Sequence, residues 1–292
     1  MTETGRQGFR HRQSAGRRIG RGLQFAGLGF ALLWTLAPLY WMVATSLKTE
    51  LEATQLDPTL FPHSITLQNY TGLAGGSLPF MQFFVNSVLT CLVAAIVAVV
   101  IAIPAAYALS RAKFRAASQV GYLILIVRMF PMVVLLAPLY LILLTTGLLD
   151  THFGLIVGYT TFGLPFAVWM IKGFIDAVPI EIEEAARVDG YPRWQILLRI
   201  VVPLIYPGLI TTGIFVLMEA WNNLIYPLTF ITTLDKQTLP AALQLTFTGQ
   251  FKTDWGGMMA ASVVTTLPLM IAFFTVQRSM VRGLTAGSVT GT

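Results

Sequence analysis

Long apolar runs alternate with short polar segments along most of this chain. A helix needs about 20 mostly apolar residues to cross the roughly 30 Å hydrocarbon core of a bilayer. Six runs reach that length, so the pattern predicts six transmembrane helices joined by shorter loops. The runs cover residues 23–46, 84–109, 120–146, 153–174, 204–229 and 258–280.

Proline occurs inside every one of these runs. Proline lacks a backbone N–H and disrupts helices in soluble proteins, but bundles of membrane helices tolerate it. We therefore expect kinks near several of the following residues: Pro38, Pro104, Pro131, Pro138, Pro165, Pro207, Pro227 and Pro268.

Composition agrees with a protein that shares its core with lipid. Apolar residues make up 55% of the chain and charged residues 11%, whereas soluble domains carry about 25% charged residues. Cys91 is the single cysteine, which excludes an intrachain disulfide and a cysteine-based metal cluster. The fold class predicted is an all-α membrane protein, with no metal site.

Lysine and arginine mark the cytoplasmic side of a membrane protein. Fifteen of the 19 basic residues fall on one side if both termini are cytoplasmic. Lys48, Lys236 and Lys252 then face outward, and Arg128 is left within a span. We expect three parts: a basic cytoplasmic tail over residues 1–22, a six-helix domain over 23–282, and a cytoplasmic tail over 283–292.

A polar block over residues 178–203, called the hairpin below, separates the fourth and fifth runs. Pro179 suits the first turn of a helix, and the acidic residues after it complement the positive helix end. Glu183 and Arg187 are spaced for an ion pair within one helix. Gly190 suits the left-handed position just past a helix end. Pro192 then starts a second short helix, from Arg193 to about Val202.

The residues of the hairpin leave two interpretations open. Ala185 and Ala186 allow close approach of another protein surface, which favours a docking element. An amphipathic hairpin lying on the membrane surface would have a similar pattern.

The hairpin resembles the EAA signature of integral membrane subunits of binding-protein-dependent ABC importers. That signature reads Glu-Ala-Ala, three residues, Gly, nine residues, then Ile-x-Leu-Pro. It matches here at Glu184, Ala185, Ala186, Gly190, Ile200 and Pro203, with Val202 in place of Leu. Other segments resemble the carbohydrate branch, the smaller permease of the maltose-transporter type: residues 86–87, 105–111, 138–140, 221–223, 253–256 and 277–287.

The resemblance implies a permease subunit for a sugar in the bacterial cytoplasmic (inner) membrane. It implies a second homologous permease, two cytoplasmic ABC ATPase subunits, and an extracellular sugar-binding protein or lipoprotein; nucleic acid is not implied. ATP binding would move the hairpin and turn a heterodimeric pore from inward-facing to outward-facing. The implied ATPase-coupling residues are Glu184, Ala185, Ala186, Arg187, Asp189, Gly190 and Pro203.

This chain is expected to be non-catalytic and to bind no cofactor. It contains no Gly-x-x-x-x-Gly-Lys-Ser/Thr phosphate loop, the sequence that cradles nucleotide phosphates. ATP and Mg²⁺ would therefore be held by the partner ATPase.

Two charges are predicted to lie within the membrane, Arg128 in the third run and Glu219 in the fifth. Such charges face the bundle interior or water. They either form a structural ion pair or line the solute path. Trp221, Asn222, Asn223 and Tyr226 offer aromatic faces and amides suited to a sugar, and with Arg128 and Glu219 they form the candidate substrate path. Ordinary bundle packing is the alternative.

Two other functional classes fit the sequence less well. An intramembrane protease would need a Gly-x-Ser-Gly nucleophile and a membrane-embedded histidine, and the sequence has neither. An ion-coupled carrier or channel subunit would leave the hairpin unexplained. Dependence on ATP or on an ion gradient distinguishes these classes.

Overall fold

The computed structural model describes residues 4–75, 79–111, 116–248 and 253–288. This part of the chain is helical and contains no named strand; one isolated bridge joins Thr248 and Thr253. The longer helices are α1 (Thr4–Ser46), α4 (Phe80–Arg111), α5 (Ala116–Met129), α6 (Met132–Thr145), α7 (His152–Asp176), α11 (Tyr206–Trp221) and α14 (Trp255–Ser288). The shorter ones are α2 (Glu50–Ala53), α3 (Gln68–Gly75), α8 (Ile180–Val188), α9 (Arg193–Ile196), η1 (Leu197–Val201), α10 (Val202–Leu204), α12 (Ile225–Phe230), η2 (Leu234–Lys236) and α13 (Leu239–Phe247).

The chain forms two compact units. The first contains the chain up to Thr71 together with Asp254–Val263, and the second contains Gly72–Thr253 and the chain from Val264 onward. In the first unit, Lys48 is buried, with its ammonium over the Trp41 ring and donating to the Thr59 carbonyl. Glu52 is also buried and accepts hydrogen bonds from Thr59 and His63, which lower its pKa to about 2.

Four helices in the described residues are long and apolar enough to cross a membrane: Gln24–Ser46, Phe80–Arg111, His152–Asp176 and Trp255–Thr275. Two bent pairs raise the number to six if each is one span. These pairs are Gln119–Met129 with Met132–Thr145, bent by 95°, and Arg193–Leu204 with Tyr206–Trp221, bent by 79°. The structure therefore has four to six candidate spans.

The sharp bends lie close to prolines, but most prolines do not break a helix. Pro131 starts α6 after the 95° bend, because a proline disfavours helical geometry in the residue before it. Pro203 and Pro207 flank the 79° bend. Five others, Pro38, Pro104, Pro138, Pro165 and Pro268, lie inside continuous helices.

The run over residues 204–229, predicted as the fifth span, is interrupted by a gap and is not one helix. Helix α11 ends at Trp221, and α12 begins only at Ile225. The Asn223 side chain accepts a hydrogen bond from the Tyr226 backbone N–H at 3.0 Å. An asparagine that bonds nearby backbone in this way competes with helix formation, and Pro227 has no N–H to donate into the gap.

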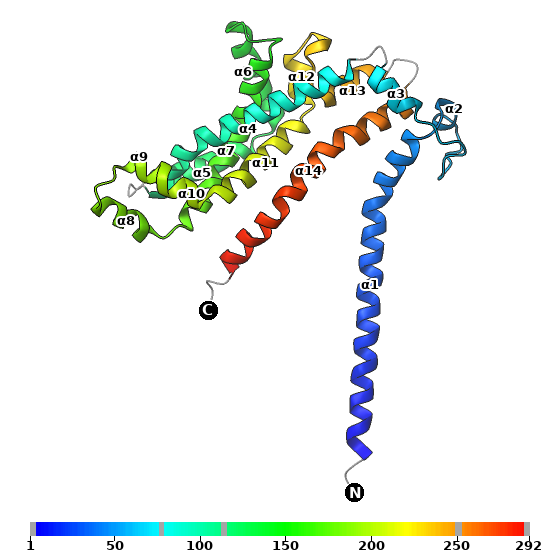
Figure 1. Cartoon of the computed structure of the whole chain (residues 1–292), viewed down its shortest axis with the longest axis horizontal. Coiled ribbons are helices and arrows are strands. Elements are labelled where there is room, and N and C mark those ends of the chain that lie inside the picture. Colours follow the sequence, from blue (N-terminus) through cyan, green and yellow to red (C-terminus); the bar gives the residue numbers. More distant parts are fainter. Residues whose placement is uncertain (1–3, 76–78, 112–115, 249–252, 289–292) are drawn as a thin grey trace. The chain divides into compact units, whose positions relative to one another are not determined.

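The core of the second unit lies between α4, α7 and α11, which run side by side (Figure 1). Ala94, Ala98, Ala102 and Ala106 are fully buried at four-residue spacing along α4. That spacing places them on one face of the helix, and small residues there let neighbouring helices approach closely. Ile171 and Ile175 of α7 are buried in the same core.

Candidate functional site

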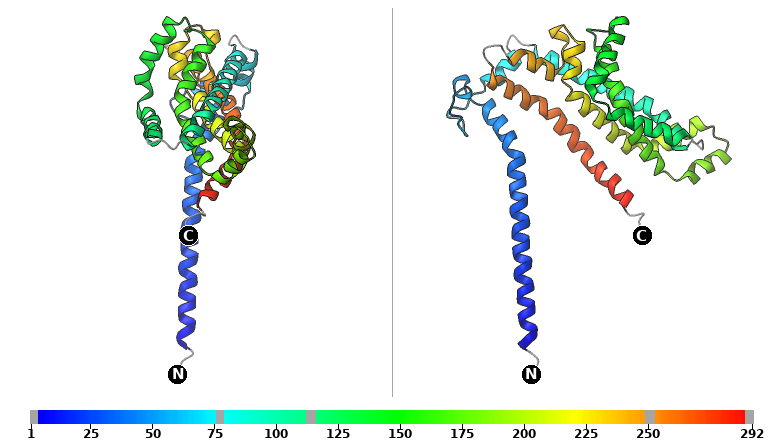
Figure 2. Two further views of the ribbon diagram at one scale, coloured as in Figure 1. Left: turned by 90° about the vertical axis from the view of Figure 1, so that its left-hand side faces the viewer. Right: turned by 180° about the vertical axis from the view of Figure 1, so that it is seen from behind.

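The hairpin of residues 178–203 folds as two short helices at one end of the second unit, beyond α4 and α7 (Figure 1; Figure 2, right). Pro179 is the N-cap of α8, and Gly190 follows its last residues with φ of +87°. Gly190 N–H donates to the Arg187 carbonyl at 3.0 Å, and Tyr191 N–H donates to the Ala186 carbonyl at 3.0 Å. These two bonds form a Schellman motif, so the predicted turn at Gly190 is confirmed.

The second arm is less regular than the sequence suggests. Helix α9 continues into a π-helical turn at Leu197–Val201 before α10. Val202 N–H donates to the Leu197 carbonyl, five residues back. Pro203 next along the chain cannot donate to an i−4 carbonyl, which accounts for the wider turn. The predicted second helix from Arg193 to about Val202 is present, with this local change of winding.

Helix α8 has a buried face and an exposed face. Glu183 and Ala186 are buried within the chain, so of the two signature alanines only Ala185 lies at the surface. The exposed residues of the implied ATPase-coupling set are Glu184, Ala185, Arg187, Asp189, Gly190 and Pro203. Val188 is 88% exposed. The exposed face of α8 is thus largely polar, and Val188 is its most exposed large apolar side chain.

Glu183 pairs with a residue other than the one expected. The sequence suggested Arg187, but Glu183 Oε1 accepts from Arg111 Nε of α4 at 2.7 Å. The Tyr107 hydroxyl of α4 donates to Glu183 Oε2 at 2.8 Å. Lys113 and Arg115, which belong to the fifteen basic residues predicted to be cytoplasmic, lie outside the described residues.

Replacing Gly190 should loosen the hairpin because its φ is left-handed. No atom lies within 4 Å of a Cβ built there, so Gly190→Ala introduces backbone strain with no collision. The left-handed conformation costs about 1–2 kcal/mol for other residues, which speeds local opening by a factor of about 5–30. Hydrogen exchange over residues 184–191 should accelerate by that factor. Gly173→Ala on α7, also with open space and with no left-handed φ, is the matched control; equal exchange in both variants would contradict the expectation.

Arg128 and Glu219 lie together in the structure. Arg128 Nη2 of α5 is 3.1 Å from Glu219 Oε1 of α11. The guanidinium carbon lies 4.5 Å from the centre of the Phe166 ring, and both charged side chains are about one third exposed. Arg128 Nη1 is buried without a hydrogen-bond partner. The pair is thus formed and partly open, with one donor unused.

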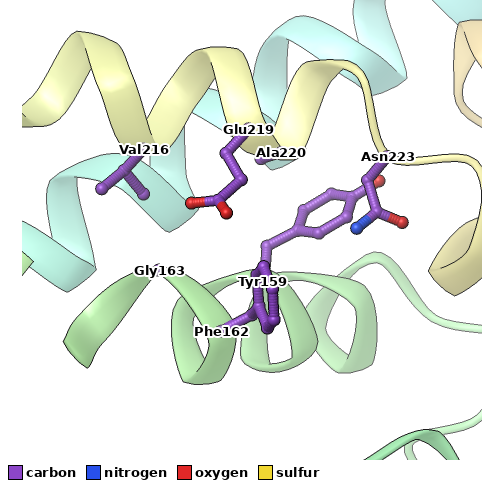
Figure 3. A pocket seen from close by; sticks show the side chains of 7 residues that line it. All are labelled: Tyr159, Phe162, Gly163, Val216, Glu219, Ala220 and Asn223. Carbon is purple, nitrogen blue, oxygen red and sulfur yellow. The ribbon is translucent and has the colours of Figure 1, made fainter. Parts of the chain in front are cut away.

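A small pocket lies against Glu219, between α7 and α11 (Figure 3). Its enclosed space is about 10 Å³, which is room for about one water molecule, and it is lined by Tyr159, Phe162, Gly163, Val216, Glu219, Ala220 and Asn223. Ligand pockets usually have about 300–1,000 Å³. This pocket by itself is therefore smaller than a typical small-molecule site.

The structure separates the residues proposed for the substrate path. Glu219 and Asn223 line the pocket, whereas Trp221 packs edge-on against Phe84 and is 3% exposed. Tyr226 is buried against Phe230. Asn222 is exposed and donates to the Met218 carbonyl of its own helix. Tyr159 and Phe162 were missed, since nothing in the sequence distinguishes them from other aromatic residues in spans.

A second polar cluster lies just before the start of α7, at the end of this helix away from the hairpin. The sequence pattern did not predict it. Asp150 accepts hydrogen bonds from the Thr232 and Thr233 backbone N–H groups and pairs with Lys236 Nζ at 2.7 Å. The bond from the Lys236 ammonium, followed by the bonds from Thr233, holds the pKa of Asp150 well below its usual range. Asp150 has a φ of 56°. No described group of three or more His, Cys, Asp or Glu residues could hold a metal ion.

The chain matches one family model and is similar to several permease proteins. Residues 98–286 match the family model described as "binding-protein-dependent transport system inner membrane component". The inner membrane ABC transporter permease protein YcjP of Escherichia coli is 40% identical over 91% of this chain and 95% of its own length. The trehalose transport system permease protein SugB of Mycobacterium tuberculosis is 37% identical, over 90% and 94%.

The fold has a solved counterpart. One chain in the crystal structure of a bacterial ABC transporter involved in the import of the acidic polysaccharide alginate superposes with a TM-score of 0.77. The match covers 90% of this chain and 97% of that chain, at 23% sequence identity. At that identity the likeness concerns the fold.

Proposed function

Because this chain belongs to the family of binding-protein-dependent transport system inner membrane components, we propose that it forms half of the translocation pore of an ATP-driven sugar importer. It is a non-catalytic membrane subunit of the inner membrane. Its proposed cargo is a mono-, di- or oligosaccharide delivered by an extracellular solute-binding protein.

The observation that carries this proposal is the geometry of the hairpin. Helix α8 lies beyond the ends of α4 and α7, and its exposed face carries Glu184, Ala185 and the turn at Gly190 (Figure 1). A short rigid helix at the end of a bundle can enter a cleft on another protein. We propose that a cytoplasmic ABC ATPase supplies that cleft and that a second ATPase serves the partner permease.

The same reasoning supports a six-span topology with both termini and the hairpin in the cytoplasm. Each bent pair would then be one broken span, and four continuous helices would complete the set. Irregular backbone at membrane depth is tolerated where it is buried in protein or lines a water-filled cavity. A pore shared with a second permease would provide such a cavity beside α5, α6 and α11.

We further propose that Arg128, Glu219 and Asn223 line this chain's side of the sugar path. The pocket beside Glu219 is too small for a disaccharide, so the partner permease must complete the site. Charged residues within spans commonly mark such paths. Trp221 and Tyr226 would support the path through packing, and Asn222 would face the partner or water.

Glu219→Ala is expected to reduce sugar uptake by about tenfold while membrane abundance falls less than twofold. The substitution leaves the Arg128 guanidinium without its carboxylate partner. The free guanidinium would then bind water or the transported solute, which would slow uptake. Quantitative immunoblots of membranes and initial uptake rates measure the two effects. Thr161→Ala, an exposed residue of α7 bonded only to its own helix, is the control. A loss confined to abundance would mean a structural pair with no part in the path.

Affinity purification in mild detergent followed by mass spectrometry tests the assembly. The proposal predicts recovery of a second six-span permease and a cytoplasmic ABC ATPase with the tagged chain. Uptake of radiolabelled trehalose and maltose into reconstituted vesicles should then need internal ATP and should survive a protonophore. A lone chain without an ATPase, with uptake that follows an ion gradient, would instead indicate the secondary-carrier class.

A further inference from the structure

A buried ion pair joins the hairpin to the rest of the second unit. Glu183 of α8 is 0% exposed, and the Arg111 side chain of α4 is 13% exposed. Their atoms Oε1 and Nε are 2.7 Å apart. A carboxylate at this depth is stable only with such partners, and Tyr107 donates to its other oxygen. Glu183 is adjacent to Glu184, but the two side chains differ completely in exposure.

Arg111 connects three separate segments at once. Besides Glu183, its Nη2 donates to the Ile175 carbonyl at 3.0 Å and to the Val178 carbonyl at 2.9 Å. Ile175 lies in the last turn of α7, where carbonyls lack the N–H partner four residues on; its carbonyl also accepts from the Val178 N–H. Val178 lies in the link from α7 to α8. One guanidinium therefore fixes the end of α4, the end of α7 and the start of the hairpin.

Neighbouring side chains strengthen the same junction. Ser110 of α4 donates to Asp176 Oδ1 of α7 at 2.5 Å, and Lys172 Nζ lies 2.6 Å from Asp176 Oδ2. The link between α7 and α8 is thus held from α4. Arg111 bonds to the Val178 carbonyl within the link, and side chains of α4 bond to the carboxylates of Asp176 and Glu183 on either side of it.

The other ends of α4 and α7 are joined by a second set of polar contacts. Asn86 of α4 donates to the carbonyls of Asp235 and Gln237, and Ser87 accepts from Leu239 N–H. Lys236 in the same segment pairs with Asp150, just before α7. Asn86 and Arg111 are 25 residues apart on one helix, which is about 38 Å at 1.5 Å per residue.

We infer that Arg111 and Glu183 are positioning residues that lock the hairpin to α4 and α7, so that displacement of the hairpin is transmitted to the segment at residues 231–239. This inference rests on the proposed function, because it assumes that an ATPase moves the hairpin. A side chain on the exposed face serves docking, whereas this buried pair serves transmission after docking.

The test compares Glu183→Gln, Arg111→Gln and the double variant in the complete complex, reconstituted with its partner permease, ATPase and binding protein. The measured quantities are the ATPase retained per permease and the sugar transported per ATP hydrolysed, with trehalose and maltose as probes. Each single variant should keep the ATPase within twofold and lose at least tenfold in transport per ATP. The double variant should be no worse than either single one, since contacting residues are non-additive. Glu181→Gln, exposed on the same helix, should match the unmodified chain.

Three outcomes would overturn the inference: unchanged transport per ATP in the single variants, additive losses in the double variant, or loss of the ATPase from Glu183→Gln. The last would make Glu183 a docking residue. If burial of an unpaired charge prevents assembly of the single variants, Tyr107→Phe removes only one hydrogen bond and should lower transport per ATP about threefold at normal abundance; an unchanged ratio would overturn the inference. Absence of any ATPase from the unmodified complex would instead refute the proposed function.

Discussion

Glu184→Lys is expected to remove the ATPase from the purified complex while the two permeases stay together. Glu184 is exposed on α8, next to Ala185 and on the side of the helix away from buried Glu183. Reversal of its charge therefore leaves the chain's own core unchanged. Loss of one partner of a buried interfacial charge pair costs about 2–5 kcal/mol, which is a factor of about 30 or more in affinity.

The control for this variant is Glu181→Lys. Glu181 carries the same charge, lies on the same helix and is also exposed, but it precedes the Glu-Ala-Ala stretch. Its ATPase recovery should stay within about threefold of the unmodified chain. The ratio of ATPase to permease in the purified material, from quantitative mass spectrometry, measures both. An unchanged ratio in Glu184→Lys would rule out docking through this face of α8.

Gly208→Ala is expected to destabilise the contact between α7 and α11 by about 1–3 kcal/mol, the usual cost of overpacking. A Cβ at Gly208 would lie 2.5 Å from Cγ of the Phe174 ring and within 2.7 Å of two further ring atoms. Phe174 packs against the core, four residues before the hairpin begins. Its ring and α11 must therefore move apart. Thermal unfolding of the purified subunit in detergent should shift downward by several degrees.

Gly213→Ala on the same helix is the matched control. There the nearest atom to a new Cβ is Val99 Cγ2 at 3.6 Å, an ordinary contact. Alanine favours a helix by about 0.5–1 kcal/mol over glycine, so the unfolding temperature should stay level or rise slightly. A fall of the same size in both variants would show that the close approach of α11 to Phe174 does not set the stability.

Features set by neighbouring residues could be predicted from the sequence. Pro179 before α8, the left-handed Gly190 and the restart near Pro192 depend only on local backbone geometry. The meeting of Arg128 and Glu219 was one of two predicted arrangements, because charges inside spans need partners. Their roles, and those of the hairpin residues, remain predictions.

Features set by contacts between distant segments could not be predicted. Glu183 has an arginine four residues away, but its carboxylate bonds to Arg111, which is 72 residues away. An ion pair between residues four apart on a helix contributes only a few tenths of a kcal/mol, so packing decides which partner Glu183 takes. The same holds for Asp150 with Lys236 and for Tyr159 at the pocket. The break after Trp221 involves a hydrogen bond that the Asn223 side chain accepts from the Tyr226 backbone N–H, which apolar patterning does not reveal.

Cross-linking from the tip of the hairpin tests the central claim most directly. Val188 is 88% exposed, and Cys91 is buried and the single cysteine, so Val188→Cys in a Cys91→Ala chain carries one reactive thiol. A thiol-directed photocross-linker activated in native membranes should join residue 188 to a cytoplasmic ABC ATPase, identified by mass spectrometry. Cross-links to lipid alone, at normal abundance of the chain, would show a hairpin lying on the membrane and would contradict the account.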